Sequence, residues 1–87
     1  MEIKVGSIVR SKAGRDKGHL FIVLATDGEY VYMADGELRK SDSPKKKKLK
    51  HIQGTNYVSQ AIAQKMNNVG SVENFEVRKA LARTEEE

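Results

Sequence analysis

Hydrophobic and polar residues follow two different patterns along the chain, and the change comes near Gly54. Before it, short runs of β-branched and aliphatic residues alternate with glycine-containing turns, as is typical of β-strands. After it, apolar residues recur every three or four positions, as on one face of an α-helix. We therefore predict a mainly β part at residues 1–54, a helical extension at 55–83 packed on it, and a disordered acidic tail at 84–87.

The first part contains several candidate strands. They are expected at 6–12, 19–26, 29–34 and 37–40, with a closing strand at 49–52. Residues 19–26, HLFIVLAT, are apolar on both faces, as expected for a strand buried in a strongly bent sheet. Asp-Gly pairs at 27–28 and 35–36 indicate hairpins with type I′ turns. Four or five short antiparallel strands in so few residues predict a small curled barrel.

Two short helices are expected after the strands. The first is predicted from a stripe of Val58, Ile62 and Met66, with Thr55 or Asn56 as its N-cap. The second begins near Asn74, and its apolar stripe consists of Val77, Ala80 and Leu81. Neither helix is long enough to be stable alone, so both should pack on the sheet or on each other.

Charge is distributed unevenly between the two parts. The chain of 87 residues carries a net charge of +4, but residues 1–53 hold 12 Lys or Arg against 7 Asp or Glu, whereas residues 54–87 hold 4 against 5. A basic domain favours polyanionic partners, nucleic acid first. The chain has no cysteine, no signal-peptide pattern and no apolar run of membrane-spanning length, so a cytoplasmic protein is expected.

Candidate catalytic chemistry is sparse. The chain has two histidines, His19 and His51, without the spacing of a metal site, and no nucleophile beside a base is recognisable. Gly14 and Gly18 do not match a Walker loop, since the spacing and the following Lys-Ser/Thr are wrong. We therefore expect no enzyme activity, no metal, no cofactor and no small-molecule substrate.

The loop at 13–18 is the first candidate binding feature. Gly14 suits a position of positive φ, and Gly18 lets the returning strand begin close to the first. Arg15 and Lys17 should project from the exposed curve, while Asp16 bonds the backbone of the turn. Such a loop can offer N–H groups and cations to phosphate oxygens. The alternative reading is a hairpin loop that its charges merely keep soluble.

The second candidate feature is the lysine run before Leu49. Such runs are commonly solvated and flexible, but the apolar Leu49 and Ile52 indicate a fixed connection. Tyr30 and Tyr32 share one strand face and form either a stacking platform or half-buried packing. His51 is either an RNA contact or a hydrogen-bonded structural residue. The full set of candidate RNA-binding residues is Lys12, Gly14, Arg15, Lys17, His19, Arg39, Lys40, Lys45, Lys46, Lys47, Lys48, Lys50 and His51.

Two segments resemble a known family. VGSIVRSKAGRDKGHLFIVL, residues 5–24, resembles the KOW motif. YVYMADGELRKSDSPKKKKLKHIQGT, residues 30–55, is similar to bacterial KOW-domain RNA-binding proteins related to the archaeal and eukaryotic large-subunit ribosomal protein fourteen of the e-type. In that group AGRDKG, ADGxLRK and PKKKKxKH recur together. The resemblance covers about residues 5–55.

The resemblance implies an SH3-like barrel of the KOW type whose partner is RNA, above all ribosomal RNA or the ribosome. Gly14 matches the glycine of the family, and Arg15 and Lys17 match its RNA-facing loop. Lys45–Lys48, with Lys50 and His51, match its basic segment. The main alternative is an SH3-like protein-interaction module within the transcription or translation machinery. Attachment to an anionic membrane is not expected, because the lysines do not lie on an amphipathic helix.

Overall fold

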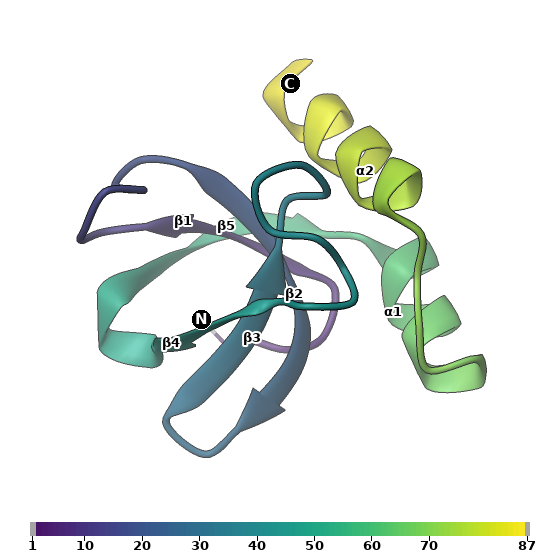
Figure 1. Cartoon of the computed structure of the whole chain (residues 1–87), viewed down its shortest axis with the longest axis horizontal. Helices are drawn as coiled ribbons and strands as arrows, with labels where there is room; N and C mark the ends of the chain where they lie inside the picture. The colour runs from purple at the N-terminus through teal and green to yellow at the C-terminus, as the bar shows by residue number, and fades with distance from the viewer. Residues whose placement is uncertain (1, 87) are drawn as a thin grey trace.

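The computed structural model describes residues 2–86, and side chains for 2–84. Its elements are β1 (Ser7–Ser11), β2 (Leu20–Asp27), β3 (Tyr30–Ala34), β4 (Lys45–Lys48), the 3-10 turn η1 (Leu49–His51), β5 (Ile52–Val58), α1 (Gln60–Asn68) and α2 (Asn74–Glu86). The strands form one antiparallel sheet in the order β4-β3-β2-β1-β5, with the helices at one side (Figure 1). This confirms the mainly β fold with C-terminal helices, although the sheet is not closed into a barrel.

Both faces of the sheet are apolar at its centre. One face buries Val9, Phe21, Val23, Val31, Met33 and Ile52. The opposite face carries a second cluster, formed by Ile8, Leu20, Ile22, Leu24 and Ala34 with helical residues against them. β2 contributes to both clusters, which explains why its sequence is apolar at consecutive positions. A register shift between Val23 and Ala25 breaks its regular alternation.

The helices cover the second cluster. Val77 and Leu81 of α2 and Ile62 of α1 are buried in it, as the apolar stripes predict. Lys65 Nζ lies 2.7 Å from Glu76 Oε2 and ties α1 to α2. The predicted N-caps of the first helix are wrong, because Ser59 Oγ accepts the Ile62 N–H instead.

The strand predictions need three corrections. Residues 37–40 form no strand, because they belong to the long connection between β3 and β4. The expected closing strand at 49–52 is mostly η1, and the last strand, β5, extends to Val58, past the boundary predicted at 54. Only the first Asp-Gly pair makes a tight hairpin. Gly28, the first of the two loop residues, has φ +59°. Within residues 2–86 no residue other than glycine has positive φ, so Glu29, the second loop residue, does not, and the turn is of type II′ rather than I′.

The end of the chain continues α2. The helix reaches Glu86, so the tail predicted to be disordered is helical there, and Glu87 lies outside the described residues. Within residues 2–86, no helix combines the length and the apolar character that crossing a bilayer requires.

Candidate nucleic-acid interface

The loop between β1 and β2 is closed by its own backbone. The Gly18 N–H donates to Ser11 O at 2.8 Å, and the His19 N–H donates to Asp16 O at 2.9 Å. Gly14 and Gly18 have φ of +84° and +86°, the left-handed conformation that glycine adopts without strain. The two glycines therefore shape the loop as predicted, and Arg15 is exposed between them.

Asp16 points inward from this loop. Its carboxylate accepts hydrogen bonds from Ser11 Oγ at 2.8 Å, Lys45 Nζ at 2.7 Å and Lys47 Nζ at 3.0 Å. The expected bond from Asp16 to the turn backbone is therefore wrong. Burial alone would raise the pKa of Asp16, but the hydrogen bonds from Lys45, Ser11 and Lys47 outweigh it and hold this pKa far below its usual range.

The four lysines of β4 divide between the two sheet faces. Lys45 and Lys47 lie opposite Met33 and Val31, on the face that buries the first apolar cluster. The Lys47 side chain is only 9% exposed and also donates to Ser11 Oγ and Ala13 O. These two lysines fasten β4 to the loop, so Lys47 has no free ammonium to offer to a phosphate.

Lys46 and Lys48 lie on the other face of β4, opposite Tyr32 and Tyr30. Both lysine side chains are exposed, whereas both tyrosines are half-buried. Lys46 Nζ stands 4.4 Å from the centre of the Tyr30 ring and 6.0 Å from that of Tyr32. This face therefore combines aromatic rings with free cations.

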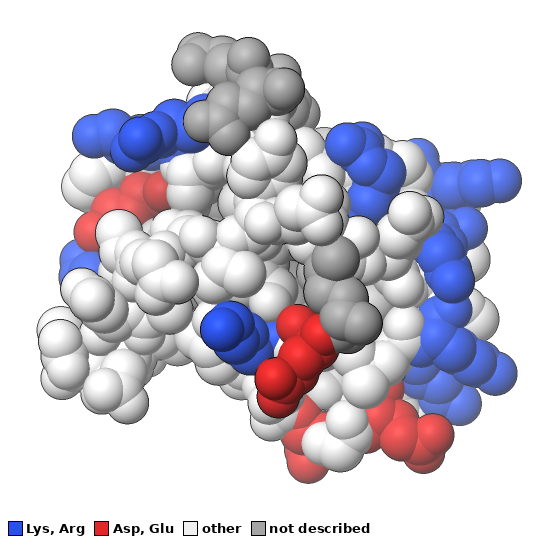
Figure 2. All heavy atoms as spheres, turned by 180° about the vertical axis from the view of Figure 1, so that it is seen from behind, with Lys and Arg blue, Asp and Glu red and all other residues white. Residues whose placement is uncertain are grey.

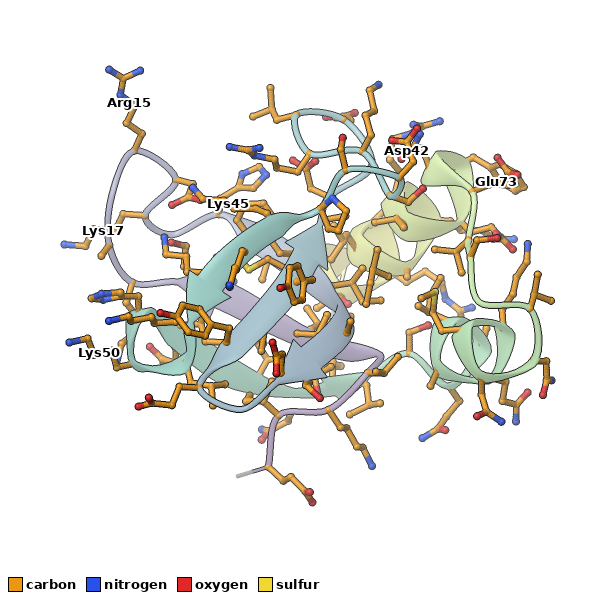
Figure 3. All side chains as sticks on the ribbon, turned by 60° about the horizontal axis from the view of Figure 1, so that its bottom comes forward. Arg15, Lys17, Asp42, Lys45, Lys50 and Glu73 are labelled. Atoms are coloured by element: carbon orange, nitrogen blue, oxygen red, sulfur yellow. The ribbon has the colours of Figure 1, made fainter. Side chains whose placement is uncertain are left out.

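A basic end forms where the β1–β2 loop and η1 lie at the same margin of the sheet. Figure 3 shows Arg15, Lys17 and Lys50 projecting outward there, away from the helices, and Figure 2 shows Lys and Arg gathered along one margin. The Lys12 N–H donates to His51 O at 2.8 Å and joins the two segments. We define the basic end by its exposed cations, Arg10, Lys12, Arg15, Lys17, Lys48 and Lys50.

The cations of the basic end have no anionic partner among the side chains that the structure describes. Among the described side chains, the ion pairs within 4 Å join His19 to Asp35, Asp16 to Lys45 and Lys47, and Lys65 to Glu76. None involves a residue of the basic end. Unpaired like charges held close together are stabilised by a polyanion that brings its own negative charge.

Arg10 was missed by the sequence predictions. It is exposed on β1, and its guanidinium donates to Gly18 O at 2.7 Å, at the end of the loop. The sequence could have indicated Arg10, because it is an outward-facing basic residue near the end of the predicted strand and lies shortly before the glycine loop. His51 is half-buried beside the basic end, so its side chain contributes little free surface.

His19 is held by the fold. Its Nε2 lies 2.7 Å from Asp35 Oδ2, and its ring packs edge-on against Phe21. The Asp35 side chain is 4% exposed. Burial would raise the pKa of Asp35, but hydrogen bonds from the N–H groups of Arg39 and Glu37, together with the His19 contact, lower it.

Arg39 and Lys40 do not join the basic end. Their segment is fastened to α2, since Ser41 N–H donates to Asn74 Oδ1 at 2.7 Å and Arg78 donates to Gly36 O at 2.8 Å. Figure 1 shows this connection beside α2, whereas the β1–β2 loop extends toward the opposite margin. The predicted cations therefore separate into the basic end, an inward pair on β4, Lys46 beside the tyrosines, and a segment beside the helices, while His19 pairs with Asp35.

Comparisons with known proteins leave the family open. No protein-family model matches the chain, and a search of curated proteins finds no match. In the part of the chain that the structure describes, no three His, Asp or Glu side chains are grouped so that they could hold a metal ion.

Proposed function

We propose that this protein binds structured RNA through its basic end. The observation that carries the proposal is the set of exposed cations that project from two segments and lack a carboxylate partner among the described residues. Positive side chains of this kind contact phosphate oxygens and position a protein on nucleic acid without reading its bases. The protein acts here as a binding module rather than an enzyme.

The sequence resemblance to KOW-domain proteins supports ribosomal RNA as the target. Of the loop residues that carry this resemblance, Arg15 and Lys17 belong to the basic end and project outward in Figure 3, and Gly14 precedes them in the same loop. A role on the ribosome or in translation would place the protein in the cytoplasm. Crosslinking the protein to RNA in cells and sequencing the bound fragments tests this part, and enrichment of other RNA classes over ribosomal RNA would contradict it.

Salt dependence tests the phosphate contacts directly. If the six cations of the basic end meet phosphates, the logarithm of the binding constant should fall with the logarithm of salt with a slope of about −4 to −5, from about −0.7 per contact on single strands and about −0.9 on a duplex. The measurement is fluorescence anisotropy with a labelled RNA hairpin over a range of potassium chloride concentrations. A complex that is insensitive to salt would contradict the proposal.

Charge-matched variants locate the surface. Replacing Arg15→Gln together with Lys17→Gln should weaken hairpin binding and make the salt slope shallower by about 1.4 to 1.8, the contribution of two phosphate contacts. The control is Lys79→Gln with Arg83→Gln on α2, which removes the same charge away from the basic end. Both variants should melt within a few degrees of the parent protein, since none of the four side chains donates a hydrogen bond within the described part. Equal binding by both double variants would argue against the basic end.

A protein-interaction role is the second candidate. A groove of about 560 Å³ lies between the start of α1 and α2, and Phe75 on its rim is 61% exposed. Tyr57 at the end of β5 also lines this groove. Recovery of a protein partner that survives nuclease treatment and high salt, and that is lost on Phe75→Ser, would favour this role over RNA binding.

A further inference from the structure

The face of β3 and β4 that carries Tyr30 and Tyr32 has no role in the fold described above. Neither tyrosine belongs to the two apolar clusters. The helices cover the same sheet face farther along β3, at Ala34. The two rings therefore lie, half-buried, on a part of the sheet that the described helices leave uncovered.

The position of Lys46 shows how the rings are presented. Its ammonium lies over the Tyr30 ring, 4.4 Å from the centre, and within 6.0 Å of the Tyr32 centre. An exposed cation reaches these faces, so the π-surface rather than the ring edge is turned outward. A stacked base is worth more than an exposed cation–π contact. A base can therefore displace Lys46, whose ammonium then meets a phosphate.

The spacing of the rings selects the kind of RNA. Two residues apart on one strand, the tyrosines follow each other at roughly 6.6 Å. Stacked bases in one strand of a DNA duplex follow at about 3.4 Å, half that distance, and the thickness of a base keeps stacked RNA bases comparably close. The two rings therefore cannot extend a base-paired stack, but they can each receive one base of an unstacked, unpaired segment.

The surface is continuous with the basic end. Tyr30 lies opposite Lys48, and Lys48 directly precedes η1, which carries Lys50. The exposed Asp27 and Glu29 of the turn between β2 and β3 lie at this same end of β3, where the Leu49 N–H donates to Glu29 O at 2.7 Å. Because these carboxylates repel phosphates, RNA that leaves the basic end is guided away from the turn and along Lys48 and Lys46.

We propose that Tyr30 and Tyr32, with Lys46 and Lys48, form a stacking site for unpaired nucleotides that flank the structured RNA held by the basic end. This inference rests on the proposed RNA-binding function and specifies its ligand further: a duplex with an adjoining single-stranded segment. Base stacking on aromatic side chains is tolerant of sequence, so the site should favour unpaired RNA without a strong base preference.

The test compares two labelled RNAs, a blunt hairpin and the same hairpin with an unpaired uridine tail. The parent protein should bind the tailed RNA more tightly, by about tenfold for each stacked base. Tyr30→Leu with Tyr32→Leu should abolish this preference and leave blunt-hairpin binding unchanged. Tyr30→Phe with Tyr32→Phe should keep it, because the ring faces persist. Tyr57→Leu, on β5, is the control and should also keep it.

A second measurement does not depend on the leucine variants folding. The chain has three tyrosines and no tryptophan, so in Tyr57→Phe protein the fluorescence comes from Tyr30 and Tyr32. The tailed RNA should quench this emission and the blunt hairpin should not. Equal affinity of the parent protein for both RNAs, or absence of quenching by the tail, would overturn the stacking site. Failure of Arg15→Gln with Lys17→Gln to weaken blunt-hairpin binding would instead overturn the proposed function.

Discussion

Within β4, two pairs of identical side chains have opposite environments. Lys45 and Lys47 turn toward the β1–β2 loop and share the carboxylate of Asp16. Lys46 and Lys48 turn outward, are exposed, and have no carboxylate within 4 Å among the described side chains. The two-residue period of a strand alone produces the difference.

The comparison shows that the number of lysines in a run does not give the number that are available to bind a partner. The inward pair uses its charge inside the protein, where Asp16, Ser11 and a backbone carbonyl satisfy it. The outward pair keeps its charge for a partner. Variants of β4 and of its partners in the loop should therefore differ sharply in stability and in binding, according to which face they alter.

The largest effect is expected for Asp16→Asn. The substitution leaves Lys45 and Lys47 without an anion while Lys47 stays buried, and breaking a buried ion pair on one side costs about 3 kcal/mol. Urea denaturation measures the loss in free energy of unfolding. Asp42→Asn, at an exposed carboxylate away from the loop, is the control and should change stability by less than about 0.5 kcal/mol. If the two variants had equal free energies of unfolding, the hydrogen bonds of Asp16 would not stabilise the fold as described.

Lys47→Met should follow, with a loss of about 2 kcal/mol, because Asp16 keeps Lys45 and Ser11 as partners while losing one charge-assisted bond. The same denaturation experiment applies. The RNA-binding constant of the folded variant should change little, since this ammonium is occupied. If Lys47→Met lost much of its RNA binding while its stability stayed unchanged, Lys47 would be an interface residue rather than a structural one.

Acid should weaken the inward pair selectively. The folded pKa of Asp16 lies below its unfolded value, so this group stabilises the protein above the unfolded pKa and loses that contribution as the pH falls toward the folded one. The ordinary pKa of an aspartate is about 3.9, and pH 6 and pH 2 lie on either side of it. Between these two pH values, the free energy of unfolding of the parent protein should fall by about 2 kcal/mol more than that of Asp16→Asn. The measurement is urea denaturation at both pH values. Parallel losses in the two proteins would contradict the role of Asp16.

Much of the fold was readable from the sequence because its signals are local. The Asp27-Gly28 hairpin, the loop glycines at 14 and 18, and the apolar stripe of α2 each depend on neighbouring residues. Residues 37–40, in the connection between β3 and β4, were misread as a strand because the anchors of this connection lie far along the chain. A Cβ at Gly36 would stand 2.6 Å from Asn74 O, a packing constraint that no local pattern reveals.

The candidate interface was readable only in part. The charge distribution assigned the basic character to residues 1–53, and the resemblance singled out the loop at 13–18. A run of four lysines, however, has no hydrophobic contrast from which to read the alternation of a strand. The partners of Lys45 and Lys47 at Asp16 lie 29 and 31 residues away. Unless the ion pairs with Asp16 are known, the sequence does not distinguish the lysines that are bound within the protein from those that are free.

The smallest stability effect is expected for Lys46→Met, the outward counterpart of Lys47→Met. It removes an exposed cation–π contact over Tyr30 and keeps most of the aliphatic side chain, so the loss should be about 0.5 kcal/mol. Its effect on RNA should be the larger one, because a free cation beside the tyrosines is lost. Binding of the tailed hairpin and urea denaturation, both measured on the two lysine variants, test this exchange: Lys47→Met should lower stability, and Lys46→Met should lower affinity for the tailed RNA. If both variants lowered the free energy of unfolding equally, the inward and outward lysines of β4 would not differ in their structural role, and the comparison would be wrong.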